Sequence, residues 1–600
     1  MMKEVNSLAS KKLSDKLAKK RRLALVYFVL LVFFLGLASR LVYVMIFDTK
    51  KLRQVAASQW TSKDTLNAKR GNILDRNGNN LAVSADVYRV DFDLTSLRTT
   101  LKDKKIDSDK FASDLSSILS LKEEDVHKAL NRTLDNDLPA SWAPLKRRVE
   151  KPEADKVKAL KIFGILVTSD TKRFYPSNNF ISHVIGHIDD DGKGVSGVES
   201  QYDKELAGEK GQLVYTRDSA SNQLFFEDSR YTKPVDGKNV ILTIDGVVQK
   251  YAEDAADKAL KENNAKGVSI MIMNPKNGEV LAMVSKPDYN PNAPRQGAKN
   301  NDELFNMWKN RPVTNLFEPG SIFKVITAAA AMEYDTSKED DKFICNGNSK
   351  ISNRIINCWE LGGHGTENFV DILRNSCNVG FMEVGKKLGK ENLNTFIKKM
   401  GFGEKTGIDL PGEEKGIVLN PSKMNDVDLA TESFGQSISV TQVQYMAAFN
   451  AIANGGTWIK PHIMKNIARY DDGGKLVIDK SYSDFNKKQI LDTHLTQTLR
   501  GYMEKVVSKG VGSNAFIKEL NIGGKTGTAQ KAENGIYKDK KYISSFAGLA
   551  PYEDPKITLI VTVDEPDESK YYAGQTAAPV AKELFNNIFN YLAINPKILN

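Results

Sequence analysis

The sequence contains few of the residues that crosslink small secreted folds through disulfides or bind metals. Its 600 residues include only three cysteines and six histidines. Three cysteines exclude a disulfide framework and leave at least one free thiol, so the stability of the chain must come from hydrophobic cores. Glycine and proline, at 42 and 19 residues, lie near background levels, which excludes collagen-like and low-complexity chains.

Long apolar runs are also scarce. Only the run over residues 23–47 is long enough to cross a membrane. Arg40 is the one charge within them, and it can snorkel to the interface. The preceding residues 1–22 carry eight Lys or Arg against one Glu and one Asp. The positive-inside bias therefore predicts a cytoplasmic basic tail, a single transmembrane anchor helix, and residues 48–600 outside the membrane.

A cleaved signal peptide is the alternative interpretation of this segment. Gly36 and Ala38 are small enough for a cleavage site, but the apolar stretch continues beyond them, which favours an anchor. The basic tail also accounts for most of the net charge of +10, so the rest of the chain gives no reason to predict a nucleic-acid partner.

The remaining sequence predicts two parts. Residues 48–238 combine short alternating strands and turns with a Lys/Asp-rich helical subdomain over residues 99–170, and we expect an elongated β-rich pedestal. Residues 239–600 begin and end with strand pairs and helices that flank about 230 mainly helical residues. This order predicts an α+β domain, with a central antiparallel sheet, a helical lobe and a cleft between them.

One serine and one lysine lie where nucleophilic chemistry is expected. The run EPGSIFK, residues 318–324, precedes the apolar run VITAAAAME, which is typical of a buried helix. Pro319 and Gly320 place Ser321 at the start of that helix, where free amides stabilise a developing anion. Lys324 follows one turn later on the same face, and a buried lysine can accept the serine proton.

This S-x-x-K pattern occurs twice, and the order of later motifs decides between the copies. Ser169 to Lys172 has the same spacing in a polar, charged stretch. Only Ser321 is followed by a complete series, Ser376-Cys377-Asn378 and then Lys525-Thr526-Gly527, in the order found in penicillin-recognising serine enzymes. Ser321 is therefore the predicted nucleophile.

K-T-G also occurs twice. Lys405-Thr406-Gly407 lies in a turn-rich stretch, whereas Lys525-Thr526-Gly527 leads into a predicted strand. Gly527 on an edge strand would let a substrate backbone approach closely. Lys525 and the hydroxyls of Thr526 and Thr528 can hold a carboxylate, so we choose this copy.

Stretches along nearly the whole chain resemble class B penicillin-binding proteins, which are monofunctional D,D-transpeptidases that crosslink peptidoglycan. In order, they are RGNILDRNGNNLA, RFYPSNN with HVIGHI, GVSGVESQYDKELAGEKG, KPDYNPN, EPGSIFK, SCN, GFGEKTGIDLPGE, SFGQ and GGKTGTAQ. The resemblance implies a penicillin-binding, β-lactamase-like transpeptidase fold for residues 239–600.

The resemblance also implies roles for the motif residues. Ser321 would attack the penultimate D-alanine carbonyl of a donor stem peptide with Lys324 as general base, while Ser376 and Asn378 relay the proton and position the substrate amide. Lys525, Thr526, Gly527 and Thr528 would bind the donor, with the amides of Ser321 and Thr528 as oxyanion hole. An acceptor amine would then attack the acyl-enzyme, and β-lactams would trap Ser321. This chemistry needs no cofactor.

For the cell, the resemblance implies a single-pass membrane protein with its catalytic domain outside. Its expected partners are a membrane-embedded glycan polymerase, contacted by the anchor helix and the RGNILDRNG region, and other cell-wall synthesis proteins. The compact length favours a role in division or sporulation over elongation. Two rival hypotheses remain: a β-lactamase-like hydrolase, for which Glu391 is only a superficial candidate base, and a non-catalytic β-lactam sensor of the same fold.

A structural zinc ion is a further hypothesis, which rests on Cys345, Cys358 and His364 between the serine and Ser376. Two thiolates and an imidazole suit tetrahedral zinc, and Asp288 is our candidate for the fourth ligand. A Cys345–Cys358 disulfide, or two buried free thiols, are the alternatives. His183 and His187 lie four residues apart, but no glutamate completes a metal motif, so we expect them to pack structurally.

Overall fold

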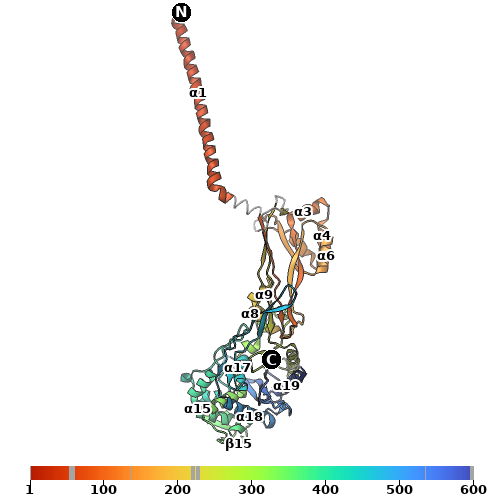
Figure 1. Cartoon of the computed structure of the whole chain (residues 1–600), viewed down its shortest axis with the longest axis vertical. Helices are drawn as coiled ribbons and strands as arrows, with labels where there is room; N and C mark the ends of the chain where they lie inside the picture. The colour runs from red at the N-terminus through yellow and green to blue at the C-terminus, as the bar shows by residue number, and fades with distance from the viewer. Residues whose placement is uncertain are drawn as a thin grey trace. The chain divides into compact units, whose positions relative to one another are not determined.

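The computed structural model describes residues 2–52, 61–134, 137–217, 223–224, 230–533 and 536–594 (Figure 1). The chain divides into two compact units. The first comprises Met1–Asn67 and Lys210–Val235, and the second comprises Ala68–Glu209 and Asp236–Asn600.

The first unit begins with a long helix. Helix α1 (Met2–Tyr43) continues through a π-helical turn at Val44–Asp48. The stretch Lys16–Leu52 is long and apolar enough to cross a membrane, and none of its most apolar part is buried in the protein. A small antiparallel sheet follows, in which β6 pairs with three strands. The sheet consists of β1 (Thr61–Leu66), β6 (Gly211–Arg217), β7 (Gln223–Leu224) and β8 (Arg230–Thr232).

A seven-stranded sheet opens the second unit. Its order is β18-β17-β9-β2-β3-β4, and β5 pairs with the other side of β3. The strands are β2 (Ile73–Leu74), β3 (Asn80–Asp93), β4 (Trp142–Val149), β5 (Ile165–Phe174), β9 (Asn239–Leu242), β17 (Met464–Tyr470) and β18 (Leu476–Ser481). Because β9, β17 and β18 follow residue 238, the sheet continues across the predicted boundary between pedestal and catalytic domain.

The predicted helical subdomain of residues 99–170 was wrong in part. Four helices are present and share a core with the strands, but β4 and the first half of β5 also lie in this range. The helices are α3 (Leu94–Asp103), α4 (Ser108–Leu119), α5 (Glu123–Leu130) and α6 (Lys151–Ala159). Phe92 on β3 is fully buried beneath them. The subdomain is therefore a sheet covered by helices.

A buried ion network joins distant segments of this region to one another. Glu199 has no exposed surface, and its two carboxylate oxygens accept hydrogen bonds from Arg70 Nε and Arg173 Nε, each at 2.6 Å. Arg70 also reaches Asp203 at 2.7 Å. Three short helices carry this segment, α7 (Ser182–Ile185), α8 (Gly197–Gln201) and α9 (Asp203–Ala207).

The central sheet of the C-terminal half has five strands in the order β11-β10-β22-β21-β20, all antiparallel. They are β10 (Gly267–Met273), β11 (Val280–Lys286), β20 (Gly523–Glu533), β21 (Ile536–Ala550) and β22 (Ile557–Asp564). Alternate side chains of β10 enter different cores. One face packs on α10 (Gly246–Glu262) and α19 (Ala577–Ile594), and the other packs on the lobe.

The helical lobe covers that second face of the sheet and carries the first two motifs, whereas the third motif lies on β20 of the sheet itself. Figure 1 shows helices α15, α17 and α18 of the lobe. Its longer helices are α13 (Lys324–Glu333), α15 (Asn378–Lys399), α17 (Gln442–Ala453) and α18 (Thr493–Lys509), with α11 (Asn301–Trp308), α12 (Arg311–Thr314), α14 (Phe369–Arg374) and α16 (Asp426–Glu432) beside them. Three short strand pairs complete it: β12–β15 (Lys342–Cys345, Gly365–Asn368), β13–β14 (Asn348–Ile351, Arg354–Asn357) and β16–β19 (Thr457–Trp458, Lys488–Gln489). The predicted α+β class, with an antiparallel sheet and a helical lobe, is confirmed.

Candidate active site

Ser321 lies in a 3-10 turn, Gly320–Phe323, that leads directly into the buried helix α13. Gly320 has φ +56°, a left-handed conformation that favours glycine, and a Cβ there would stand 3.1 Å from the Cβ of Ala529. The fully buried Tyr445 supports the turn from below, because its hydroxyl donates to the carbonyl of Ile322 at 2.9 Å. The sequence thus predicts correctly that Ser321 stands at a helix entrance.

Lys324 lies one turn further on and is completely buried. Its Nζ donates to the Ser376 carbonyl oxygen at 2.7 Å, to Asn378 Oδ1 at 2.7 Å and to Ser376 Oγ at 3.3 Å. The amine therefore links the first motif to the second, fifty residues later in the chain. The rings of Phe381 and Phe434 lie 5.5 and 6.0 Å from it, which keeps the site poorly solvated.

Ser376 joins all three motifs. It has φ +57°, which is strained for a residue with a side chain, and its Oγ accepts a hydrogen bond from Lys525 Nζ at 2.9 Å as well as the longer one from Lys324. A hydroxyl that accepts from two amines keeps its own hydrogen free to donate. Ser376 can therefore pass a proton between the lysines and a third group in the pocket.

Both lysine amines are easier to deprotonate than free lysine. Burial lowers the pKa of Lys324 to about 8. Burial, and then the positive charge of Lys324, hold the pKa of Lys525 well below its usual value. An anion bound at Lys525 would restore the charge of that amine and leave Lys324 as the neutral base.

Strand β20 carries the third motif along the edge of the sheet. A Cβ at Gly527 would lie 2.9 Å from the carbonyl oxygen of Pro319 and 3.0 Å from the nitrogen of Ile322. Only glycine therefore allows β20 to pack this closely on residues 319–323, which form the nucleophile turn around Ser321. The hydroxyl oxygen of Thr528 accepts a hydrogen bond from the amide of Ala573 at 3.0 Å. Its hydrogen thus remains available to a substrate carboxylate.

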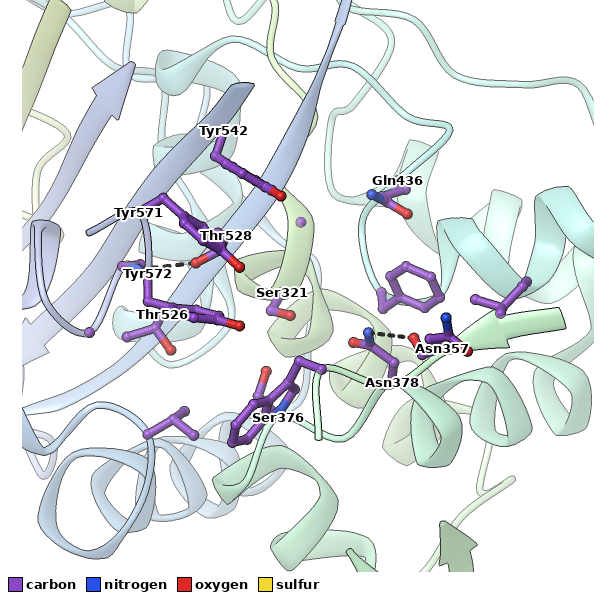
Figure 2. Close-up of a pocket in the computed structure, with 17 residues that line it drawn as sticks. Ser321, Asn357, Ser376, Asn378, Gln436, Thr526, Thr528, Tyr542, Tyr571 and Tyr572 are labelled. Carbon is purple, nitrogen blue, oxygen red and sulfur yellow. Dashed lines mark hydrogen bonds between the residues drawn. The ribbon is translucent and has the colours of Figure 1, made fainter. Parts of the chain in front are cut away.

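A pocket of about 470 Å³ opens between β20 and the lobe (Figure 2). The hydroxyls of Ser321, Ser376 and Thr526 and the amide of Asn378 surround it in the figure. Its lining consists of Gly320, Ser321, Ile356, Asn357, Trp359, Ser376, Asn378, Phe434, Gln436, Val511, Thr526, Thr528, Tyr542, Tyr571, Tyr572, Ala573 and Gly574. The structure therefore brings the predicted motif residues to a single cavity, with Lys324 and Lys525 buried behind Ser376.

The other copies of the short motifs lie elsewhere. Ser169 and Lys172 lie on the pedestal strand β5, and Lys172 forms a surface ion pair with Glu150 at 3.0 Å. Thr406 of the second K-T-G binds Glu413 through both its amide and its hydroxyl, which closes a structural turn. Neither copy lines the pocket.

Three thiols and one imidazole gather beside the second motif. The Sγ atoms of Cys345, Cys358 and Cys377 and a ring nitrogen of His364 all lie within 4.8 Å of one another. The three cysteines are free, so the alternative of a Cys345–Cys358 disulfide is absent from the structure. The hydrogen bond with Cys377 lowers the pKa of Cys358, which favours one thiolate in the pair.

The prediction of Asp288 as the fourth ligand was wrong. Asp288 instead accepts a hydrogen bond from Lys286 Nζ at 2.6 Å and one from Asn179 at 3.0 Å. Cys377 is instead the fourth residue of this cluster, because the short S-x-N motif directs its middle side chain toward the other thiols while the outer two face Lys324. The sequence prediction rests on residue type, which gives no reason to prefer Cys377 to Asp288.

Other pocket residues also carry little sequence signal. Tyr542, Tyr571 and Tyr572 form a continuous stack, with ring centroids 4.0 and 4.5 Å apart, and they come from β21 and from the segment before α19. Two adjacent tyrosines before a helix were the only hint available. His183 and His187 pack structurally as expected, against the carbonyl of Met307 and the hydroxyl of Tyr289.

Comparison with known families agrees with this geometry. The penicillin binding protein transpeptidase domain matches residues 268–586, and the penicillin-binding protein dimerisation domain matches residues 65–242. The chain therefore belongs to the penicillin-binding protein transpeptidase family.

Individual relatives span almost the whole chain. It is 36% identical over 587 residues to stage V sporulation protein D of Bacillus subtilis, covering 98% of this chain and 88% of that protein. It is 29% identical to a peptidoglycan D,D-transpeptidase FtsI of Buchnera aphidicola, covering 99% of each.

Solved structures share the fold. Penicillin-binding protein 2X of Streptococcus thermophilus matches with a TM-score of 0.70 at 26% identity, over 90% of this chain and 81% of that one. Penicillin-binding protein 3 of Mycobacterium tuberculosis matches with a TM-score of 0.65 at 24% identity, over 88% and 98%.

Proposed function

We propose that this protein is a peptidoglycan D,D-transpeptidase that works through an acyl-enzyme on Ser321. The observation that carries the proposal is the meeting of two buried amines, Lys324 and Lys525, on the single hydroxyl of Ser376 beside Ser321. Relatives that span nearly the whole chain are named peptidoglycan D,D-transpeptidases, which supports the substrate class.

Acylation begins when a donor stem peptide places its terminal carboxylate against Lys525 and the hydroxyls of Thr526 and Thr528. The neutral amine of Lys324 takes the proton of Ser321 Oγ, and that oxygen forms a bond to the penultimate D-alanine carbonyl carbon. The amides of Ser321 and Thr528 hold the oxyanion. When the carbonyl re-forms, the peptide bond breaks, and the proton reaches the departing D-alanine amine through Ser376.

The second half reverses these roles with a different amine. The side-chain amine of an acceptor stem peptide attacks the ester carbonyl and forms the new peptide bond while the ester bond to Ser321 Oγ breaks. The proton lost by the amine passes through Ser376 and Lys324 to that oxygen, which restores the hydroxyl of Ser321. Turnover is therefore ping-pong. β-Lactams, which resemble the donor terminus, acylate the same oxygen and block the pocket.

The composition of the pocket favours transfer over hydrolysis. A β-lactamase-like enzyme needs a base that activates water, but within the described ranges the lining includes no aspartate or glutamate. Glu391, the candidate base from the sequence, is exposed on α15 and lies outside the lining. The intact pair Ser321 and Lys324 counts against a sensor without catalytic activity.

For its place in the cell, we propose residues 1–22 in the cytoplasm, one membrane span and the catalytic half outside, in agreement with the basic tail before the apolar helix. Peptidoglycan glycans must be polymerised for the crosslinks, and we propose a membrane-embedded glycan polymerase and other cell-wall synthesis proteins as partners. The similarity to a sporulation protein supports a role in sporulation or division.

We further propose that Cys345, Cys358, His364 and Cys377 hold a structural zinc ion. Three thiols and an imidazole are the donors of tetrahedral zinc sites, whose ligand atoms lie about 3.8 Å apart, so the present spacing needs only a small contraction. His364 Nδ1 lies 3.7 Å from Cys358 Sγ, so this ring nitrogen already faces the thiols. Zinc would fix the backbone around Cys377 and so hold Ser376 and Asn378 in place.

Labelling the full-length protein with a fluorescent penicillin tests the catalytic proposal. We expect stable labelling of the wild type and of Ser169→Ala, and none of Ser321→Ala. Rapid release of the label from the wild type would indicate the hydrolase instead. Mass spectrometry of crosslinked products from lipid-linked disaccharide-peptide and a polymerase then tests transfer directly.

Metal content tests the zinc proposal separately. Inductively coupled plasma mass spectrometry should find about one zinc per chain in the wild type and much less in Cys358→Ser. Absence of zinc from both preparations would contradict the proposal.

A further inference from the structure

The β20–β21 hairpin contacts the nucleophile turn and the residue before it at three successive levels. Gly527 packs on Pro319 and Ile322, and Ala529 packs on Gly320, both through close van der Waals contact. The third level lies further along the hairpin, where the hydroxyl of Tyr537 on β21 donates to both carboxylate oxygens of Glu318 at 3.2 and 3.1 Å. Glu318 stands three residues before Ser321, so this contact joins the far end of the hairpin to the start of the nucleophile motif.

Glu318 is also fixed from the opposite side. Its Oε1 accepts the amide hydrogen of Ser437 at 3.0 Å, a residue held at φ +63°. The same loop binds the turn twice more, because the amide of Gly320 donates to Gly435 at 2.8 Å and Phe317 pairs with Val440. Glu318 therefore sits on a rigid base, and its carboxylate reaches from that base to the hairpin.

The distance between strand β20 and the turn that carries Ser321 matters for the proposed catalysis. The proposed oxyanion hole has one amide on the nucleophile turn, at Ser321, and the other on β20, at Thr528. No covalent segment shorter than 200 residues connects them, so their separation depends on packing between β20 and the turn. A hydrogen bond beyond Ala529 resists a rotation of the hairpin that the two van der Waals contacts alone would permit.

We infer that Glu318 and Tyr537 form a latch that holds the β20–β21 hairpin on the nucleophile turn, and that Glu318 is a positioning residue for acylation of Ser321. The inference rests on the proposed function, since the distance that the latch sets is the width of the oxyanion hole. The latch acts through Ser321 and Thr528 and needs no contact of its own with the substrate.

Rapid-mixing kinetics with a fluorescent penicillin, on the full-length protein, test the latch. Tyr537→Phe removes only the hydroxyl, and we expect the limiting acylation rate to fall on the order of fivefold, because the two oxyanion amides are then held less firmly in place. The penicillin concentration that gives half the limiting rate should not change, because the oxyanion forms only after binding. Tyr470→Phe, at another exposed tyrosine, is the matched control and should keep the wild-type rate.

Two variants of Glu318 show whether its role depends on accepting hydrogen bonds or on its negative charge. Glu318→Gln keeps an oxygen that can accept from Tyr537 and Ser437, so it should retain most of the rate, whereas Glu318→Ala should lose at least as much as Tyr537→Phe. Adding Tyr537→Phe to Glu318→Ala should cost nothing more, because both remove the same contact. The melting temperature of Tyr537→Phe should match that of the wild type.

Some results would overturn the latch while leaving the proposed function intact. One such result is a wild-type acylation rate in Tyr537→Phe. The others are equal losses of acylation rate in Glu318→Gln and Glu318→Ala, or additive losses of rate in the double variant. Each result counts only if the wild type itself is labelled on Ser321. Failure of the wild type itself to be labelled on Ser321 would instead reject the proposed function.

Discussion

Gly527 of β20 lies so close to Pro319 that a Cβ at position 527 would stand 2.9 Å from the Pro319 carbonyl oxygen. The neighbouring nitrogen of Ile322 would be 3.0 Å away, and both atoms belong to the backbone of the nucleophile turn, which cannot rotate aside. The strand proposed to bind the substrate and the turn that carries Ser321 are thus packed backbone to backbone.

We therefore expect Gly527→Ala to lower the acylation rate about 10²-fold or more. The added methyl group pushes β20 away from the turn and separates the two oxyanion amides, and loss of one such donor costs about 10²–10³ in rate. Stopped-flow acylation by a fluorescent penicillin measures this. Gly501→Ala on α18, where a Cβ meets nothing within 4 Å, is the control and should acylate normally.

The acylation rate should rise with pH and reach half its maximum near pH 8. Burial lowers the pKa of Lys324 to about 8, so below that pH the amine is protonated and cannot accept the Ser321 proton, whereas above it the amine is free. Lys324→Arg should abolish acylation, because a guanidinium stays charged. A rate that is flat between pH 6 and pH 9 would contradict this role.

Glu199→Ala should destabilise the protein by about 3–5 kcal/mol, because it leaves the buried Arg70 and Arg173 without their shared carboxylate. Thermal unfolding followed by circular dichroism measures the effect as a lower melting temperature. Asp86→Ala removes the exposed ion pair with Lys69 and should change the stability by less than about 0.5 kcal/mol. Equal effects of the two variants would argue against the buried network.

Removal of zinc by a strong chelator should lower the melting temperature and slow acylation. Cys377 lies between Ser376 and Asn378, so relaxation of the site disturbs both hydrogen-bond partners of Lys324. Cys358→Ser should melt at the lower temperature from the start and should not respond to the chelator. A chelator effect of the same size in both proteins would point to a different metal.

The motif residues of the active site could be predicted from sequence because each motif is short. Within EPGSIFK or GGKTGT, local backbone geometry fixes how the side chains lie, so Ser321, Lys324 and Lys525 were found together with their context. The choice between the two S-x-x-K copies needed only the order of motifs along the chain. Local rules and motif order are both visible in a single sequence.

Contacts between distant segments could not be predicted in the same way. Asp288 was a plausible ligand by residue type, but the tertiary fold places it against Lys286, while Cys377 reaches the other thiols because Ser376 adopts a positive φ. Strand β4 was missed because it lies at a sheet edge, where the consecutive basic residues Lys146, Arg147 and Arg148 look like the exposed side of a helix.

The order of strands in the central sheet has a consequence for how the protein matures during its synthesis. Strand β10 pairs directly with β22, about 290 residues later, and the strand that carries Lys525 joins only through β21 and β22. A nascent chain that has emerged as far as residue 500 already displays Ser321, Lys324 and Ser376, yet it has neither the carboxylate site nor the second oxyanion amide. The nascent chain should therefore become reactive toward β-lactams late and abruptly, when β20, β21 and β22 join the sheet.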